Sequence, residues 1–177
     1  MQILRTLFIG TLLMTIKVYG QVPQDIPFYL NSKQVSKAGK DFYNGKFMAG
    51  DDTKTLSISD SLNTNNNLTR PFYIYLVSEM IDKADGALSE ALGNACKEFI
   101  EYHSDEAIDF LYSNNNMVEK KFIDNWAKAI AGEFMIDCEG KEKQCIKKSL
   151  LIALIKSRSD NKLKLKEFYQ KVEGYCQ

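Results

Sequence analysis

The sequence predicts an all-α protein, an irregular bundle of six or seven helices cross-linked by two disulfides. From Pro71 to the end of the chain, apolar residues recur at spacings of three and four, which is typical of amphipathic helices. No segment alternates apolar and polar residues over the length of a strand. Three hairpins of similar length, 71–102, 104–135 and 144–175, make a HEAT-like stack of helical hairpins the alternative arrangement.

The first 20 residues have the pattern of a cleavable signal peptide. Met1–Arg5 carries a positive charge, Leu7–Ile16 is a largely apolar run, and Val18-Tyr19-Gly20 supplies small or modest side chains before Gln21. We expect cleavage near Gly20/Gln21 and a secreted or periplasmic protein. An uncleaved anchor is the alternative, but the apolar run is short for a membrane span.

Composition limits the partners of the remaining chain, residues 21–177, which we expect to form a single helical domain. It contains 21 Lys and Arg against 23 Asp and Glu, so it lacks the basic excess that nucleic-acid binding requires. No second apolar run approaches the roughly 20 residues of a membrane span, so no stable membrane insertion is expected after cleavage.

The part of this domain before Pro71 is less regular than the rest. Residues 21–30 contain Pro23 and Pro27 and are expected to be an extended leader. Residues 32–47 place Val35, Ala38, Gly39 and Phe42 on one face of a first helix. Residues 48–70 are rich in Asp, Asn, Ser and Thr and are predicted to be a long, mobile polar loop, with room for one short helical turn near 57–62.

Pro71 fits the first turn of a helix, where its missing N–H costs nothing. Residues 72–81 are apolar on most sides, which predicts a central helix that is packed by several neighbours. Asp85-Gly86 ends it. Ser104 is a good N-cap, followed by acidic residues in the first turn, where they suit the helix dipole. The later apolar stripes predict helices over 87–102, 104–112, 118–134 and 146–157. A last helix, capped by Ser159 or Asp160, is predicted to continue to residue 175.

Four cysteines in an exported chain indicate disulfides. Cys138 and Cys145 bracket a short polar loop containing a glycine, which can bring the two residues to bridging distance. Cys96 and Cys176 would then form the second disulfide and tie the last helix to an early one. A zinc site is disfavoured because the chain has no C-x-x-C and only one histidine. No metal and no cofactor is predicted.

Candidate catalytic groups are few. His103 could act as a base and Ser104 adjoins it, but neighbours in sequence on a helix do not face each other, so a helix junction is the better interpretation. A catalytic thiol would need an unpaired cysteine near His103. Carboxylates that could serve sugar hydrolysis are Asp51, Asp52, Glu90, Glu98 and Glu101, although scattered acids usually form a solvated helix face.

Aromatic side chains flank the predicted loop, and aromatic residues are favoured at protein interfaces. The candidate binding residues are Tyr43, Phe47, Asp51, Asp52 and Tyr73, with core packing as the alternative role for the aromatic ones. The sequence therefore favours an exported, non-enzymatic protein-binding module, inhibitor-like or immunity-like, that uses the 48–70 loop. A small secreted hydrolase and a carrier of an apolar ligand between helices are the alternatives.

Overall fold

The computed structural model describes residues 24–64 and 66–176, and over these residues the chain is helical without strands. The predicted signal peptide, 1–20, lies outside the described residues. The helices are α1 (Ile26–Asn31), α2 (Lys37–Tyr43), α3 (Thr53–Asp60), the 3₁₀ turn η1 (Ser61–Asn63), α4 (Arg70–Ile81), α5 (Gly86–Tyr102), α6 (Ser104–Leu111), α7 (Lys121–Asp137), α8 (Glu142–Lys156) and α9 (Lys162–Tyr175). The all-helical class is thus confirmed, although these nine α-helices exceed the six or seven expected.

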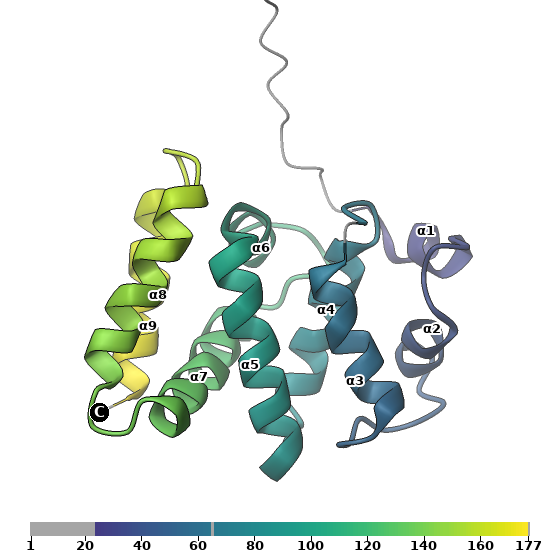
Figure 1. Cartoon of the computed structure of the whole chain (residues 1–177). Coiled ribbons are helices and arrows are strands. Elements are labelled where there is room, and N and C mark those ends of the chain that lie inside the picture. The colour runs from purple at the N-terminus through teal and green to yellow at the C-terminus, as the bar shows by residue number, and fades with distance from the viewer. Residues whose placement is uncertain (1–23, 65, 177) are drawn as a thin grey trace, which may run out of the picture.

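The helices follow one another across the molecule from one end to the other (Figure 1). At one end lie α1, α2 and α3, and at the other α8 and α9 form an antiparallel hairpin. Between them α5 packs along α7, and α7 packs along α9. The hairpin expected over 104–135 is uneven, because α6 has 8 residues and α7 has 17. Within the described residues, no helix has the length and apolar character needed to cross a bilayer.

The helix expected to be central is α4. Its side chains Phe72, Ile74, Leu76, Val77 and Met80 are all buried, and Pro71 occupies its first turn as predicted. Burying a large aliphatic or aromatic side chain stabilises the fold by about 1.5–3 kcal/mol, so this helix anchors the core.

The beginning of the chain is more helical than the sequence indicated. Residues 26–31 form α1 rather than an extended leader, with Pro27 in its first turn. The helix expected over 32–47 is shorter. It starts only after Ser36, whose Oγ accepts a hydrogen bond from the Gly39 N–H, and it ends before Gly45, which has a left-handed φ of 67°.

The long polar loop expected over 48–70 is largely folded. Asp52 caps α3 by accepting hydrogen bonds from the backbone N–H groups of Lys54 and Thr55. The apolar side chains Ile58 and Leu62 are fully buried in the core. The predicted mobile loop is therefore wrong for most of this segment. Ile58 and Leu62 lie about one helical turn apart, so both side chains reach the same core.

One disulfide is present among the described residues, between Cys138 and Cys145, and it confirms that pairing. The expected second disulfide, Cys96–Cys176, is wrong, and both thiols are free. Cys96 is fully buried in α5, whereas the Cys176 Sγ lies 3.6 Å from the carbonyl oxygen of Ala131 on α7. The last helix therefore ends against α7 and is not tied to α5.

Candidate binding groove

A groove of about 510 Å³ lies between α2, the connection to α3, and α4. Most of its wall is apolar, and two charged residues complete it, Glu79 of α4 and Lys83 just after that helix. It is lined by Phe42, Tyr43, Gly45, Phe47, Met48, Ala49, Tyr75, Leu76, Glu79, Met80 and Lys83. Its volume is within the usual range for sites that bind small molecules.

The outer wall of the groove is a tight turn after α2. Gly45 adopts a left-handed conformation, and the Lys46 N–H donates to the Asp41 carbonyl oxygen at 2.9 Å. The rings of Phe42 and Phe47 then meet across the turn with centroids 5.7 Å apart. The Lys54 ammonium lies 3.8 Å from the Phe47 ring centroid, a cation–π contact that connects the turn to α3.

Asp41 fixes this turn electrostatically. Its carboxylate pairs with Lys37 and accepts a hydrogen bond from Lys46 at 2.9 Å. The hydrogen bond from Lys37, followed by the one from Lys46, lowers the pKa of Asp41 to about 2. The carboxylate therefore stays ionised at neutral pH and joins the start of α2 to the turn that follows it.

Two of the side chains that line the groove, Met48 and Tyr43, are exposed to solvent. Met48 is 88% exposed and Tyr43 is 37% exposed. The Tyr43 ring centroid lies 6.2 Å from that of Tyr75, which in turn contacts the core ring of Phe122 at 6.3 Å. The exposed ring of Tyr43 thus packs against Tyr75, which packs against the buried ring of Phe122.

Glu79 supplies the groove's carboxylate. Burial raises its pKa, and the nearby Glu119 adds to the effect, while Lys121 and Lys83 oppose it. Burial, followed by the field of Glu79, raises the pKa of Tyr75 to about 12, so its phenol remains a hydrogen-bond donor. The groove therefore offers an apolar wall with the carboxylate of Glu79, the phenols of Tyr43 and Tyr75, and the ammonium of Lys83.

The five residues expected to bind a partner are not brought together. Tyr43 and Phe47 line the groove. Tyr73 is buried, and its hydroxyl accepts a hydrogen bond from the Ser36 N–H at 2.9 Å. Asp52 caps α3, and Asp51 is exposed beside it.

The candidate binding residues predicted from the sequence do not include Tyr75, Glu79 or Lys83, which also line the groove. A usable signal exists, because Tyr75, Glu79 and Lys83 follow one another at spacings of four. That spacing marks one stripe of polar groups that runs along α4 and past its end at Ile81, whereas most other residues of the helix are apolar.

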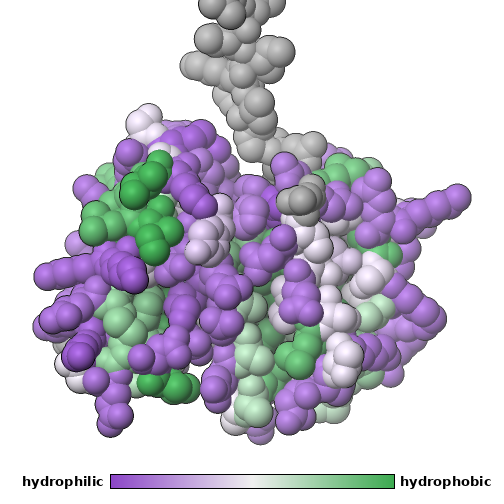
Figure 2. Space-filling view, in the orientation of Figure 1, coloured by the Kyte–Doolittle hydropathy of each residue, from purple (hydrophilic) through white to green (hydrophobic). Residues whose placement is uncertain are grey.

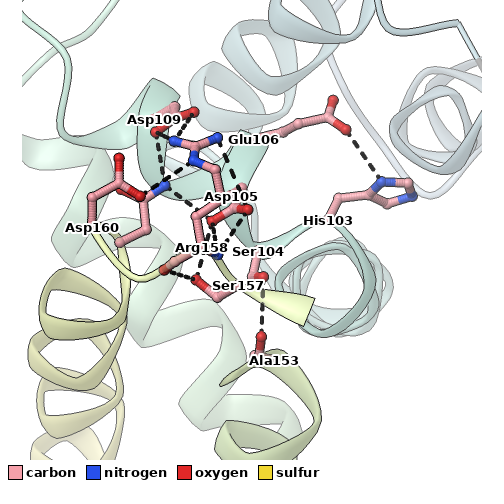
Figure 3. A network of polar contacts seen from close by, with 10 residues as sticks. His103, Ser104, Asp105, Glu106, Asp109, Ala153, Ser157, Arg158 and Asp160 are labelled. Carbon is pink, nitrogen blue, oxygen red and sulfur yellow. Dashed lines mark hydrogen bonds and ion pairs between the residues drawn. The ribbon is translucent and has the colours of Figure 1, made fainter. Parts of the chain in front are cut away.

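A second polar cluster joins α6 to the turn between α8 and α9 (Figure 3). Asp105 accepts hydrogen bonds from the Arg158 N–H at 3.0 Å and from the Ser157 hydroxyl at 3.1 Å. Asp109 accepts from the Arg158 guanidinium at 2.9 Å and from the Asn161 amide at 2.8 Å. Because its donors and acceptors pair with one another, this cluster is a structural junction.

His103 lies at the same junction but has other partners. Its ring stacks on Phe99, with centroids 5.2 Å apart, and its Nδ1 lies 3.5 Å from Glu106. Burial raises the pKa of Glu106, but hydrogen bonds from His103 and Arg70 outweigh it, so this pKa lies below its usual value. The neighbouring Ser104 hydroxyl instead donates to the Ala153 carbonyl oxygen at 3.2 Å, so His103 and Ser104 do not form a catalytic pair (Figure 3).

The other candidate acids lie away from the groove. Glu90, Glu98 and Glu101 all belong to α5 and none of them lines the groove. In the part of the chain that the structure describes, no group of three or more His, Cys, Asp or Glu side chains could hold a metal ion.

Comparison of the chain with protein-family models, with curated proteins and with solved structures finds no match.

Proposed function

We propose that this chain is an exported, non-enzymatic protein-binding module, inhibitor-like or immunity-like, whose groove receives an apolar side chain of a partner protein. The observation that carries the proposal is the pair Tyr43 and Met48, which stand exposed at the mouth of an otherwise rigid aromatic groove. Interface hot spots are enriched in aromatic residues, and methionine adapts its shape to a partner.

The carboxylate of Glu79 and the ammonium of Lys83 add specificity to this proposal. Charged groups beside an apolar pocket orient a partner more than they strengthen its binding. A partner segment with an apolar anchor and an adjacent basic side chain would fill the groove and pair with Glu79. That pairing would favour the ionised form of Glu79, against the effect of burial.

The Cys138–Cys145 disulfide supports the exported part of the proposal, because disulfides persist in oxidising compartments. The open mouth supports a protein partner over a carried apolar ligand, because a carrier site is expected to enclose its ligand. The hydrolase alternative is less well supported. His103 and Ser104 line a separate, smaller pocket of about 160 Å³ together with Asp105 and Glu106, but the Ser104 hydroxyl donates to the Ala153 carbonyl oxygen and not to His103.

A capture experiment tests the proposal. The oxidised protein and two variants are immobilised and exposed to an extract of the host's cell envelope and medium, and retained proteins are quantified. Tyr43→Ser combined with Met48→Ser is expected to lose a partner that the parent protein retains. Ile136→Ser is the matched control, because Ile136 is 58% exposed on α7, away from the groove. Retention of every partner by the groove variant would contradict the proposal.

Point variants are preferable to replacing the 48–70 segment. That replacement would remove Ile58 and Leu62 from the core, and each such loss costs about 2–5 kcal/mol. A loss of binding would then report unfolding and not the groove.

A further inference from the structure

The hairpin of α8 and α9 exposes a second apolar surface, at the opposite end of the molecule from the groove. Its members are Leu151, Ile155 and Leu163, which are 61%, 84% and 68% exposed. Figure 2 shows hydrophobic side chains gathered over this end of the molecule, among hydrophilic ones. We name these three residues the hairpin patch.

The hairpin patch does not serve the core. Leu151 and Ile155 are four residues apart and share one face of α8, whereas the buried residues Ile146, Ser149 and Ala153 lie on the opposite face. In α9 the buried residues Leu165, Phe168 and Val172 likewise lie away from Leu163. The three exposed side chains do not line the groove between α2 and α4.

The hairpin patch is surrounded by lysines. Lys147 and Lys148 precede Leu151 by one helical turn and are exposed, and Lys162, Lys164 and Lys166 are exposed around Leu163. Lys156 lies over the ring of the exposed Tyr102, with its ammonium 4.2 Å from the ring centroid.

Charge is divided unevenly between the hairpin and the rest of the described chain. Residues 142–175 contain nine Lys and Arg against four Asp and Glu, a formal charge of +5. Residues 24–141 contain 12 Lys and Arg against 19 Asp and Glu, a formal charge of −7. The near-neutral total conceals a basic end, which concentrates positive potential around the hairpin patch.

We propose that the hairpin patch rests on the surface of an anionic phospholipid bilayer, with its three apolar side chains at the level of the acyl-chain boundary. Lysines with long aliphatic stems keep their ammonium groups among anionic headgroups while apolar neighbours enter the interface. Tyr102, with its apolar ring and polar hydroxyl, has the character that membrane interfaces favour.

The same features disfavour other occupants. A second copy of this chain would bring two hairpins of formal charge +5 together, and like charges repel. A protein interface is expected to have few lysines around its apolar centre, whereas these three exposed side chains stand among exposed lysines. The proposal concerns peripheral binding and is independent of the groove.

Vesicle sedimentation tests the proposal. The full chain is expressed so that any processing of its N-terminal segment takes place, and the oxidised product is mixed with vesicles of phosphatidylcholine, with or without phosphatidylglycerol. Binding to the anionic vesicles is expected, and added salt should weaken it. Binding to neutral vesicles reports any contribution of an N-terminal segment that is retained.

Two pairs of variants separate the apolar and the basic contributions. Ile155→Ser with Leu163→Ser, and separately Lys147→Glu with Lys148→Glu, should each lower partitioning onto anionic vesicles by about tenfold or more. Their controls, Met135→Ser with Ile136→Ser and Lys33→Glu with Lys120→Glu, alter exposed residues elsewhere and should retain binding. Circular dichroism checks that every variant is folded.

Two results would overturn the proposal. One is an absence of binding to anionic vesicles by the parent protein, which would leave an acidic protein as the occupant of the hairpin patch. The other is vesicle binding that the hairpin variants and their controls weaken equally.

Discussion

Gly93 of α5 lies directly against the backbone of Ala129 in α7: a Cβ atom added to Gly93 would stand 2.7 Å from the Ala129 carbonyl oxygen. The obstructing atom belongs to the main chain of a helix, so it cannot rotate away as a side chain would. Gly93 therefore sets how closely α5 and α7 approach each other in the middle of the molecule (Figure 1).

Gly93→Ala is expected to destabilise the protein by about 1–3 kcal/mol, because overpacking outweighs the better helix propensity of alanine. The matched control is Gly132→Ala on α7, where an added Cβ would meet no atom within 4 Å. That change should stabilise the protein by up to about 1 kcal/mol. Urea unfolding followed by circular dichroism measures the stability of both variants. Equal effects of the two substitutions would contradict the close approach of α5 and α7 at Gly93.

Ser78 of α4 is the polar partner of the buried Trp126. Its hydroxyl accepts a hydrogen bond from Trp126 Nε1 at 2.8 Å and donates one to the Ile74 carbonyl oxygen at 2.7 Å. Ser78→Ala leaves the indole N–H without a partner and should cost about 1–3 kcal/mol of unfolding free energy.

The control for this change is Ser57→Ala, at an exposed serine whose hydroxyl donates to a backbone oxygen of α3. It should alter stability by no more than about 0.5 kcal/mol. Tryptophan fluorescence during urea unfolding reports both variants. A Ser78→Ala protein as stable as the parent would show that the indole is not confined to this partner.

The Asp41 ion pairs predict a pH dependence at the groove turn. The pKa of Asp41 in the folded protein is lowered to about 2. The stability that the Asp41 ion pairs give the folded state is therefore fully present above the usual carboxyl pKa of 3.8 and is lost as the pH falls toward 2. Asp41→Asn should therefore destabilise the protein at pH 7, and the difference from the parent should shrink between about pH 4 and 2.

Unfolding midpoints in urea at several pH values check this prediction. Asp51→Asn serves as the control because Asp51 is exposed in the same segment, and it should have little effect at any pH. A difference between parent and Asp41→Asn that stays constant from neutral to acid pH would contradict the assignment.

The cysteines should differ chemically. Under denaturing, non-reducing conditions, mass spectrometry should find free thiols at Cys96 and Cys176 and a bridge between Cys138 and Cys145. In the folded protein, Cys176 should react with an alkylating agent before Cys96, whose pKa burial raises well above its usual value.

Breaking the Cys138–Cys145 bridge by replacing both cysteines with serine should cost about 2.5 kcal/mol, the loop-closure value for so short a loop. The paired control, Cys176→Ser, removes a free and partly exposed thiol and should change stability little. A mass spectrum that showed Cys96 bridged to Cys176 would contradict the structure.

The sequence predicted those features that depend on neighbours along the chain. Pro71 marks a helix start, the apolar surround of residues 72–81 marks a central helix, and the polar loop between Cys138 and Cys145 allows a bridge. Each of these depends on residues within a few turns of one another, where helical periodicity and turn chemistry act directly.

Features that depend on distant segments were not predicted. The polar segment 48–70 folds because Ile58 and Leu62 reach a core supplied by other helices, which its composition conceals. The pairing of Cys96 with Cys176 rested on elimination and fails because Cys176 ends against Ala131 of α7. Tyr73 and Tyr75 are two tyrosines in the same apolar stretch of sequence, yet only Tyr75 lines the groove. The packing of α4 against α2 decides which of the two side chains is buried and which faces the groove.

Photo-crosslinking at the groove mouth shows whether a partner protein occupies the groove. A photoreactive phenylalanine analogue replaces Met48 in one variant and Ile136 in another, and each protein is irradiated in living cells of its host. We expect the probe at residue 48 to form a covalent adduct with one protein. Tyr43→Ser in the same chain should abolish the adduct, and the probe at residue 136 should not form it. Equal adducts from both positions, or an adduct that Tyr43→Ser leaves unchanged, would contradict the binding of a partner in the groove.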